Sequence, residues 1–446
     1  MSIENNILGR KLNSTLPPMG LEAAVRRHHL PLDRNVGRNM MELAFSKHSG
    51  ANLAPSQEND PSTRRQTRVD ELQSQVMKLA ESMRIAVIFG GDKRQPGAVI
   101  NPTYNPRHWK SYEAVAEDIA AALRRIGFRF VTTLPDDMNL GDRLRRERVH
   151  FAWLNSGGVQ GIGSVGHAAA MMEMFGIPYV GHNPLSAATM DSKNVMKRDL
   201  MLAGLPTAPF FVWHPGRGPL DPTIDPRFRK AFESHEGTFV VKPISGRASR
   251  DVSAVDSIEC LHEAVEAVHK STGNAVLIET YLPGREFCVA VCGEVVARRG
   301  QLGRMGQPFT FAAVERALDQ DERIFTSMDH RPITTDRVRQ LTSDSDSEVL
   351  SQLKQIARQV YSEFDIETLI RLDVRADTQG RLFILEANPK PDLAAPTDGR
   401  VSIVCAGLQN EGMRYDDLIL SLIADRVDVL FTQRRAVVRH LASLLN

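Results

Sequence analysis

The sequence from residue 369 to residue 388 is Leu369-Ile-Arg-Leu-Asp-Val-Arg-Ala-Asp-Thr-Gln-Gly-Arg-Leu-Phe-Ile-Leu-Glu-Ala-Asn388. Apolar and polar residues alternate on both sides of its Asp-Thr-Gln-Gly segment, which predicts two antiparallel strands joined by a two-residue turn. Side chains of a strand point to opposite faces in turn, so one face of this hairpin should be apolar. The other face should carry Arg371, Asp373, Glu386 and Asn388.

The polar face of this hairpin fits either a metal site or a solvated surface. If Asp377 pairs with Gly380, Arg371 lies opposite Glu386, while Asp373 lies opposite an isoleucine. Two carboxylates and an amide oxygen are hard ligands that suit Mg²⁺ in combination with substrate phosphates. A solvated hairpin face with an arginine–glutamate pair would give the same pattern, so the residues alone leave both interpretations open.

Strands and helices alternate in the part of the chain that precedes the hairpin. The apolar run Ile85–Phe89 ends in two glycines, and a helix is expected from Ser111 to Ile126. A second strand is expected at Phe151–Leu154, followed by a glycine-rich loop at residues 155–163. This alternation predicts an α/β protein, and such proteins bind ligands at the carboxyl ends of their strands.

One segment has features that are typical of phosphate binding. Lys242 ends the apolar run that begins at Thr238, and a buried ammonium group at such a place requires an anionic partner. Residues 244–251 contain glycine, serine and arginine, which can donate hydrogen bonds to phosphate oxygens. We therefore expect a lid at residues 244–251 over a nucleotide, with a solvated lysine at a strand edge as the alternative for Lys242.

Composition excludes several classes of function. The chain has 446 residues with 55 Lys and Arg against 54 Asp and Glu, so no basic surface for nucleic acid is expected. No apolar run approaches the roughly 20 residues that a membrane helix needs, and the N-terminus lacks an apolar signal core, so we expect no membrane partner and a cytoplasmic protein. The cysteines lack C-x-x-C spacing and are expected to be reduced apolar residues: Cys260, Cys288, Cys292 and Cys405.

Residues 1–83 differ from the rest of the chain. Residues 46–70 are rich in Ser, Asn, Gln, Arg and Pro, which is typical of a linker. Residues 70–83 carry apolar side chains at helical spacing, including Leu72 and Leu79, and should form a helix with one buried face.

Several separate motifs occur in an order that is known from one enzyme superfamily. They are Phe89-Gly-Gly91, Gly176-Ile-Pro-Tyr-Val-Gly181, Met190-Asp-Ser-Lys193, Ala203-Gly-Leu-Pro206, Val241-Lys-Pro243, Leu277-Ile-Glu279, Gly284-Arg-Glu-Phe287, Arg371-Leu-Asp373 and Leu385-Glu-Ala-Asn388. On these motifs, residues 84 to about 427 resemble the ATP-grasp superfamily, most closely the D-alanine-D-alanine ligase family.

The resemblance implies an α/β ATP-grasp fold with ATP held between its last two parts. The implied domains are an N-terminal extension at residues 1–83, an α/β preATP-grasp domain at 84–185, a central ATP-grasp subdomain with the lid at 186–283, and a C-terminal subdomain with the magnesium site at 284–446. A homodimer is also implied.

The resemblance also assigns roles to individual residues. The ATP-binding residues that it implies are Lys193, Lys242, Ser249, Glu279, Tyr281, Leu282 and Glu286. The implied ligands of two Mg²⁺ ions are Asp373, Glu386 and Asn388. The residues assigned to catalysis are Arg371, which would stabilise an oxyanion and contact the substrate, and Ser249. Ser402 would contact a substrate carboxylate.

The reaction that the resemblance implies is the ADP-forming ligation of a carboxylate to an amine through an acylphosphate. The family carries a glutamate after its first strand that holds the ammonium group of the first D-alanine, and residues 92–104 contain no counterpart. Because such departures occur where substrates bind, we expect a related ligase that acts on another amino acid or peptide. The alternatives are a true D-alanine-D-alanine ligase, a non-catalytic ATP-binding regulatory protein, and ligation to a hydroxyl or a thiol.

Overall fold

A computed structural model describes residues 61–233, 235–318, 322–324, 337–397, 402–433 and 438–445. The chain divides into residues 1–59 and residues 60–446, and all of the described residues belong to the second unit. The first 60 residues of the expected N-terminal extension, including most of the expected linker, therefore lie outside the described residues.

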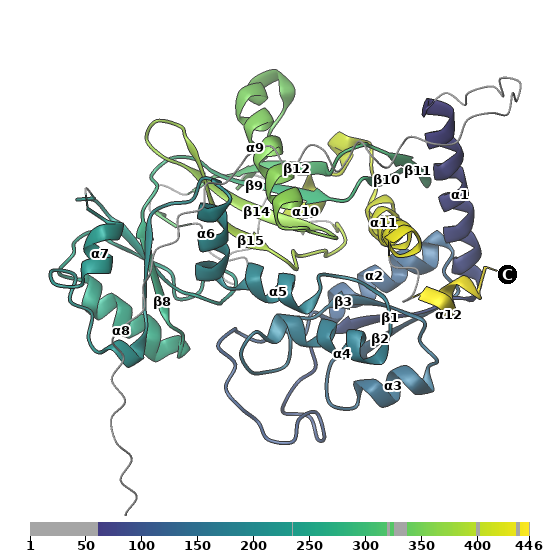
Figure 1. Ribbon diagram of the computed structural model, residues 1–446, viewed down its shortest axis with the longest axis horizontal. Helices are drawn as coiled ribbons and strands as arrows, with labels where there is room; N and C mark the ends of the chain where they lie inside the picture. The colour runs from purple at the N-terminus through teal and green to yellow at the C-terminus, as the bar shows by residue number, and fades with distance from the viewer. Residues whose placement is uncertain are drawn as a thin grey trace, which may run out of the picture. The chain divides into compact units, whose positions relative to one another are not determined.

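Helix α1 (Pro61–Ser82) begins nine residues before the predicted helix, so the linker prediction is wrong for residues 61–69. Proline is favoured at the first position of a helix, and the Arg and Gln residues of this stretch are good helix formers, so polar composition was a poor guide here. The predicted stripe is buried, with Val76 and Leu79 fully inaccessible. This stripe packs beside helix α11 (Tyr415–Gln433), near the other end of the chain (Figure 1).

The first sheet is parallel, as the alternation of strands and helices predicts. Its strand order is β2-β1-β3-β4, and every neighbouring pair is parallel. The strands are β1 (Arg84–Phe89), β2 (Phe130–Pro135), β3 (Phe151–Asn155) and β4 (Tyr179–Val180), and the helices among them are α2 (Glu113–Ile126), α3 (Leu140–Arg146) and α4 (His167–Phe175). Helix α2 confirms the helix expected at residues 111–126, with its start two residues later.

A second sheet is antiparallel and has the order β5-β8-β6-β7. Its strands are β5 (Phe210–Trp213), β6 (Phe239–Pro243), β7 (Ser253–Val255) and β8 (Val276–Thr280). The helices of this region are α5 (Pro184–Asp191), α6 (Lys193–Leu202), α7 (Pro226–Ala231) and α8 (Leu261–Thr272). Aromatic side chains fill its core, where the ring centroids of Phe228 and Phe232 lie 4.8 Å apart.

A third sheet has the order β13-β12-β9-β14-β15 and is antiparallel throughout. Its strands are β9 (Glu286–Cys292), β12 (Phe309–Arg316), β13 (Val338–Gln340), β14 (Ile370–Ala376) and β15 (Leu382–Asn388), with a separate ribbon of β10 (Val295–Arg298) and β11 (Gln301–Arg304). Helix α9 (Ser343–Glu363) packs on β9 and β12. The remaining helices are α10 (Ile403–Ala406), α11 and α12 (Arg439–Ala442).

Strands β14 and β15 form the predicted hairpin, but its predicted register is wrong. Asp373 lies opposite Glu386 rather than opposite an isoleucine, and the pairing shifts by one residue after Asp373. The turn contains three residues between Asp377 and Arg381, because Gly380 adopts a left-handed conformation with φ of 79° that a three-residue hairpin loop requires. The shift places two carboxylates directly across from each other.

Gly284 allows the turn before β9 to approach the end of the hairpin closely. Its N–H donates to the carbonyl of Ala376 at 3.0 Å, and a Cβ atom there would lie 2.6 Å from the carbonyl oxygen of Asp377. We expect Gly284→Ala to lower the free energy of unfolding by about 1–3 kcal/mol, because backbone atoms would have to move apart. Urea denaturation measures this, with Gly216→Ala as the control, since nothing lies within 4 Å of a Cβ at that position. Equal stability of the two variants would contradict the prediction.

Within the described residues, no helix has the length and apolar character needed to cross a membrane. The four cysteines are free, as expected; three are buried and Cys260 is exposed.

Candidate active site

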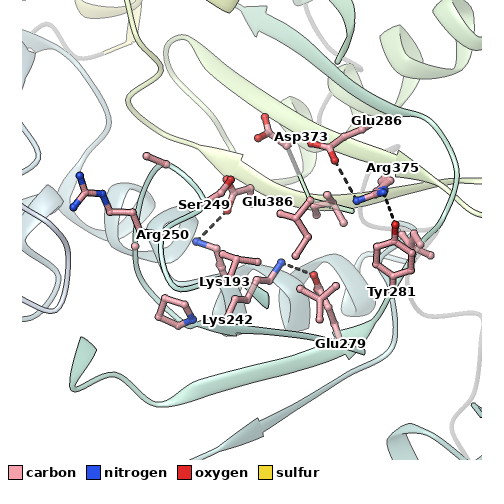
Figure 2. Close-up of a pocket in the computed structure, with 18 of the residues that line it drawn as sticks. Lys193, Lys242, Ser249, Arg250, Glu279, Tyr281, Glu286, Asp373, Arg375 and Glu386 are labelled. Atoms are coloured by element: carbon pink, nitrogen blue, oxygen red, sulfur yellow. Dashed lines mark hydrogen bonds and ion pairs between the residues drawn. The ribbon is translucent and has the colours of Figure 1, made fainter. Parts of the chain in front are cut away.

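A pocket lies between the second and third sheets (Figure 2). Its empty volume is about 750 Å³, including space open to solvent, which is within the range of small-molecule sites. Strands β6 and β8 line one side, β9, β14 and β15 line the other, and residues 246–250 border it. The predicted residues that line it are Lys193, Lys242, Ser249, Glu279, Tyr281, Leu282, Glu286, Asp373 and Glu386.

Glu279 is held between two lysines in the wall of the pocket. The Nζ atom of Lys242 contacts one of its carboxylate oxygens, and the Nζ atom of Lys197 lies 3.0 Å from the other. Burial raises the pKa of Glu279, but the two ammonium groups outweigh this effect and lower the pKa to about 2. Glu279 is therefore ionised, and it supplies the anionic partner that a buried Lys242 requires.

A second group of charges lies on the hairpin. Lys193, at the start of α6, places its Nζ atom 3.0 Å from Glu386, which lies across the strands from Asp373. Burial raises the pKa of Asp373, but Arg371 and Arg316 outweigh it and lower the pKa to about 2. The pKa of Glu386 is also lowered, because Lys193 outweighs the effect of burial. Both carboxylates are therefore ionised, and in this structure arginine and lysine side chains are their cationic partners.

Two arginines that the sequence analysis missed complete the ion-pair network. Arg316 contacts Glu286, and its Nη2 atom lies 3.2 Å from Asp373. Arg375 lies 3.3 Å from Glu286 and donates to the hydroxyl of Tyr281 at 3.1 Å (Figure 2). These arginines therefore contact Glu286 from two strands, and Arg375 also ties the Tyr281 hydroxyl to this network.

The residues present fit a magnesium ion that is bound partly through phosphates. Among the residues that the structure describes, no group of three His, Cys, Asp or Glu side chains could hold a metal. The oxygen donors on this face of the hairpin are thus the carboxylates of Asp373 and Glu386 and the amide oxygen of Asn388. Mg²⁺ is often held by one or two carboxylates together with substrate phosphates, so this donor set is sufficient.

Three predicted site residues do not line the pocket: Arg371, Asn388, which lies across the hairpin from Arg371, and Ser402. Arg371 lies beside the pocket and binds Asp373 with two hydrogen bonds, from Nε at 2.8 Å and from Nη2 at 3.1 Å. Ser402 is buried at the start of α10, where its Oγ atom accepts a hydrogen bond from the N–H of Cys405 at 3.1 Å. The structure therefore gives Ser402 a helix-capping contact and does not bring it to the pocket.

The expected lid lies at the pocket with a strained backbone. Ala248, Ser249 and Asp251 have positive φ angles of 61°, 50° and 56°, which residues with side chains rarely adopt. Ser249 lines the pocket, whereas the guanidinium of Arg250 points away from the other labelled side chains (Figure 2). The lid thus lines the pocket with backbone, the Ser249 hydroxyl group and parts of Arg247 and Arg250.

Cations also surround Tyr112, which precedes α2. Arg247 of the lid donates from Nε to the Tyr112 hydroxyl at 3.1 Å, and the Nζ atom of Lys390 lies 3.2 Å from the centre of the ring. Burial raises the pKa of Tyr112, but Lys390, Arg107 and Arg247 outweigh this effect and lower the pKa to about 7. The segments that carry these cations are far apart in sequence, so the cluster was not predicted.

The three sheets and the pocket between the last two define the ATP-grasp fold. A crystal structure of D-alanine–D-alanine ligase from Bacillus anthracis complexed with ATP has this fold, with a TM-score of 0.57 and 18% identity over 78% of this chain and 98% of that chain. The structure of the D-alanine–D-alanine ligase from Coxiella burnetii gives a TM-score of 0.55 at 17% identity over 80% of this chain and 98% of that chain.

The model of the family described as D-ala D-ala ligase C-terminus matches residues 200–424, and the chain belongs to this family. The D-alanine–D-alanine ligase of Streptomyces griseus is 32% identical over 126 residues, which are 28% of this chain and 32% of that protein. An uncharacterized protein of Sinorhizobium fredii, y4sG, is 29% identical over 231 residues, which are 47% of this chain and 62% of that protein. The chain therefore spans less than two thirds of the length of these curated relatives.

Proposed function

We propose that the protein is an ATP-dependent, ADP-forming carboxylate–amine ligase that joins amino acids or peptides. The observation that carries this proposal is the pocket that Lys193 and Lys242 line together with the opposed carboxylates of Asp373 and Glu386. The family match and the relatives that are named D-alanine–D-alanine ligases support it. A structural neighbour in complex with ATP supports ATP as the nucleotide.

In this proposal the charged groups of the pocket hold the nucleotide. Lys193 and Lys242 exchange part of their contact with carboxylates for phosphate oxygens, and Ser249 of the lid donates to the same phosphates. Glu279 and the backbone at residues 281–282 receive the adenine, and Glu286 receives the ribose. Asp373, Glu386 and Asn388 would hold Mg²⁺, which we propose binds as two ions, and the metal would supply positive charge to offset that of the phosphates.

A carboxylate is a poor electrophile, so it must be activated before an amine can attack it. The substrate carboxylate attacks the γ-phosphorus, the bond to ADP breaks, and an acylphosphate forms. The amine then loses a proton and attacks the acyl carbon, and inorganic phosphate leaves as the amide forms. Arg371 stabilises the oxyanion of this step, and the lid at residues 244–251 excludes the water that would hydrolyse the acylphosphate.

A true D-alanine–D-alanine ligase is the second candidate. Several relatives are D-alanine–D-alanine ligases by name, including the protein from Streptomyces griseus, which favours this candidate. The segment at residues 92–104 has no glutamate to hold a substrate ammonium group, which favours a different amino acid or peptide.

The remaining parts of the proposal concern organisation. We propose the domain boundaries given by the resemblance, a homodimeric state and a cytoplasmic location. Sedimentation of the full chain tests the dimer, because a monomer and a dimer differ twofold in mass.

The reaction is tested by measuring ADP and phosphate release with Mg²⁺ and pooled D- and L-amino acids and short peptides, with mass spectrometry of the products. The proposal predicts release that depends on a substrate pool, together with a product mass equal to two substrates minus one water. Release with D-alanine alone would favour the second candidate. A protein that binds ATP but releases no ADP with any pool would contradict both.

A further inference from the structure

Four cations from three separate segments lie around Tyr112, next to the proposed ATP pocket: Arg107, Lys110, Arg247 and Lys390. Arg107 belongs to the segment between β1 and α2, Arg247 to the lid, and Lys390 to the turn that follows β15. Arg247 donates to the Tyr112 hydroxyl, and Lys390 lies over the face of its ring. The three segments therefore lie together in one small region.

Gathering positive charges in a partly buried region is unfavourable unless anions balance them. Arg107 has such a partner, because it contacts Asp191, which also accepts a hydrogen bond from Ser245 at 2.6 Å. Lys390 differs: within the described part of the chain it forms no ion pair within 4.0 Å, and the carboxylate that acts on it, Asp392, is two residues further along the chain. The close partner of Lys390 is the π face of Tyr112, which compensates an ammonium group less than a carboxylate does.

The region adjoins the place where phosphoryl transfer would occur. Arg247 lines the same pocket as Lys193 and Glu386. Lys390 follows Asn388, the proposed metal ligand, by two residues, so its backbone is anchored to the end of β15. A substrate whose reacting carboxylate lies at Lys193 and Glu386 can therefore extend toward Arg247 and Lys390.

The backbone of Tyr112 supports a role for this region in binding. Its φ of 59° and ψ of 15° are left-handed, a conformation that is unfavourable for a residue with an aromatic side chain. Gly157 packs beside it, with a Cβ position 3.6 Å from both the Arg107 Nε atom and the Tyr112 ring. The surrounding contacts thus hold the ring in place between the cations.

Building on the proposed function, we propose that Arg107, Arg247 and Lys390 bind a second carboxylate of the substrate, so that the ligase acts on an acidic amino acid or on a peptide that contains one. Guanidinium groups recognise carboxylates through paired hydrogen bonds, and an ammonium group adds a point charge. An uncharged amide of the same shape lacks the charge that Lys390 attracts and binds less well.

The test compares acidic substrates with their amides of equal size. ADP release is measured for the wild-type chain with D- and L-aspartate, D- and L-glutamate and dipeptides of these, and with the corresponding asparagine and glutamine compounds. We expect kcat/KM to be higher for the acidic member of a pair by about 10- to 100-fold.

Lys390→Met should reduce this preference about tenfold or more, mainly by raising KM for the acidic substrate. Lys390→Arg keeps the charge and should restore most of the preference, which separates loss of charge from misfolding. Lys78→Met, at an exposed position of α1, is the matched control and should keep the wild-type preference.

Each result has a definite meaning. Equal use of acidic and amide substrates by the wild type would overturn the inference while leaving the ligase function intact. If Lys390→Met kept the wild-type preference for acidic substrates, this result would also overturn the inference. If Tyr112→Phe and Lys390→Met lower kcat equally for acidic and neutral substrates, the cations serve the Tyr112 phenol instead, which also overturns the inference. No ADP release with any substrate would overturn both the inference and the proposed function.

Discussion

Glu386→Gln is expected to lower kcat for ADP release by about a hundredfold to a thousandfold. Its carboxylate lies 3.0 Å from Lys193 and opposite Asp373, at the junction of the proposed phosphate and magnesium sites. The amide has the same shape but no charge, so it binds a cation weakly and no longer balances Lys193. Initial rates at saturating ATP and varied Mg²⁺ measure the loss, and the Mg²⁺ requirement should rise.

Glu315→Gln is the matched control for this experiment. Glu315 lies on β12 of the same sheet and pairs with Arg285 and Arg339, but it does not line the pocket. Its kcat should change by less than about threefold, because exposed ion pairs contribute little. Undiminished activity in Glu386→Gln would refute the assignment of Glu386 to the magnesium site.

Glu279→Gln is expected to lower the free energy of unfolding by about 3–5 kcal/mol. The substitution leaves Lys197 and Lys242 as buried ammonium groups without their shared carboxylate, and the two positive charges also repel each other. Guanidinium chloride denaturation at pH 7 measures the change, and Glu315→Gln should change stability by less than about 1 kcal/mol. A Glu279→Gln variant as stable as the wild type would show that the three charges do not stabilise the fold.

The same variant should change how stability depends on pH. The pKa of Glu279 is lowered to about 2 from an ordinary value of 4.5, so its contribution is fully present above pH 4.5 and is lost as pH falls toward 2. The wild type should therefore lose more stability than Glu279→Gln between pH 5 and pH 3. Parallel pH profiles of the two proteins would contradict this explanation.

The sequence predicted the two strands of the hairpin correctly, but it did not predict which residues pair between them. Alternation of apolar and polar residues identified both strands and the polar face. The register depended on the left-handed Gly380 and on the shift after Asp373, which pair Asp373 with Glu386. Neither feature changes the alternation pattern, so the pattern alone could not separate the predicted register from the observed one.

The sequence also predicted the pocket residues that belong to local motifs better than it predicted their interaction partners. The pocket residues named in advance lie in short local motifs, whereas Arg316 joins them only because its position on β12 pairs with Glu286 on β9. That pairing crosses thirty residues of sequence and leaves no local signal. Two other partners could have been predicted from local spacing. Arg375 alternates with Arg371 and Asp373 on β14, so the three share one face of the strand, and Lys197 lies one helical turn after Lys193.

The most direct test of the ligase proposal is the transfer of oxygen from substrate to phosphate. The amino-acid pool is prepared with ¹⁸O in its carboxylate groups and incubated with the full chain, ATP and Mg²⁺, and the inorganic phosphate is analysed by mass spectrometry. Formation of an acylphosphate that an amine then cleaves at the acyl carbon predicts one ¹⁸O atom in each phosphate released. Phosphate released without ¹⁸O would show that water attacks ATP directly, and would contradict the proposal that the protein activates a carboxylate.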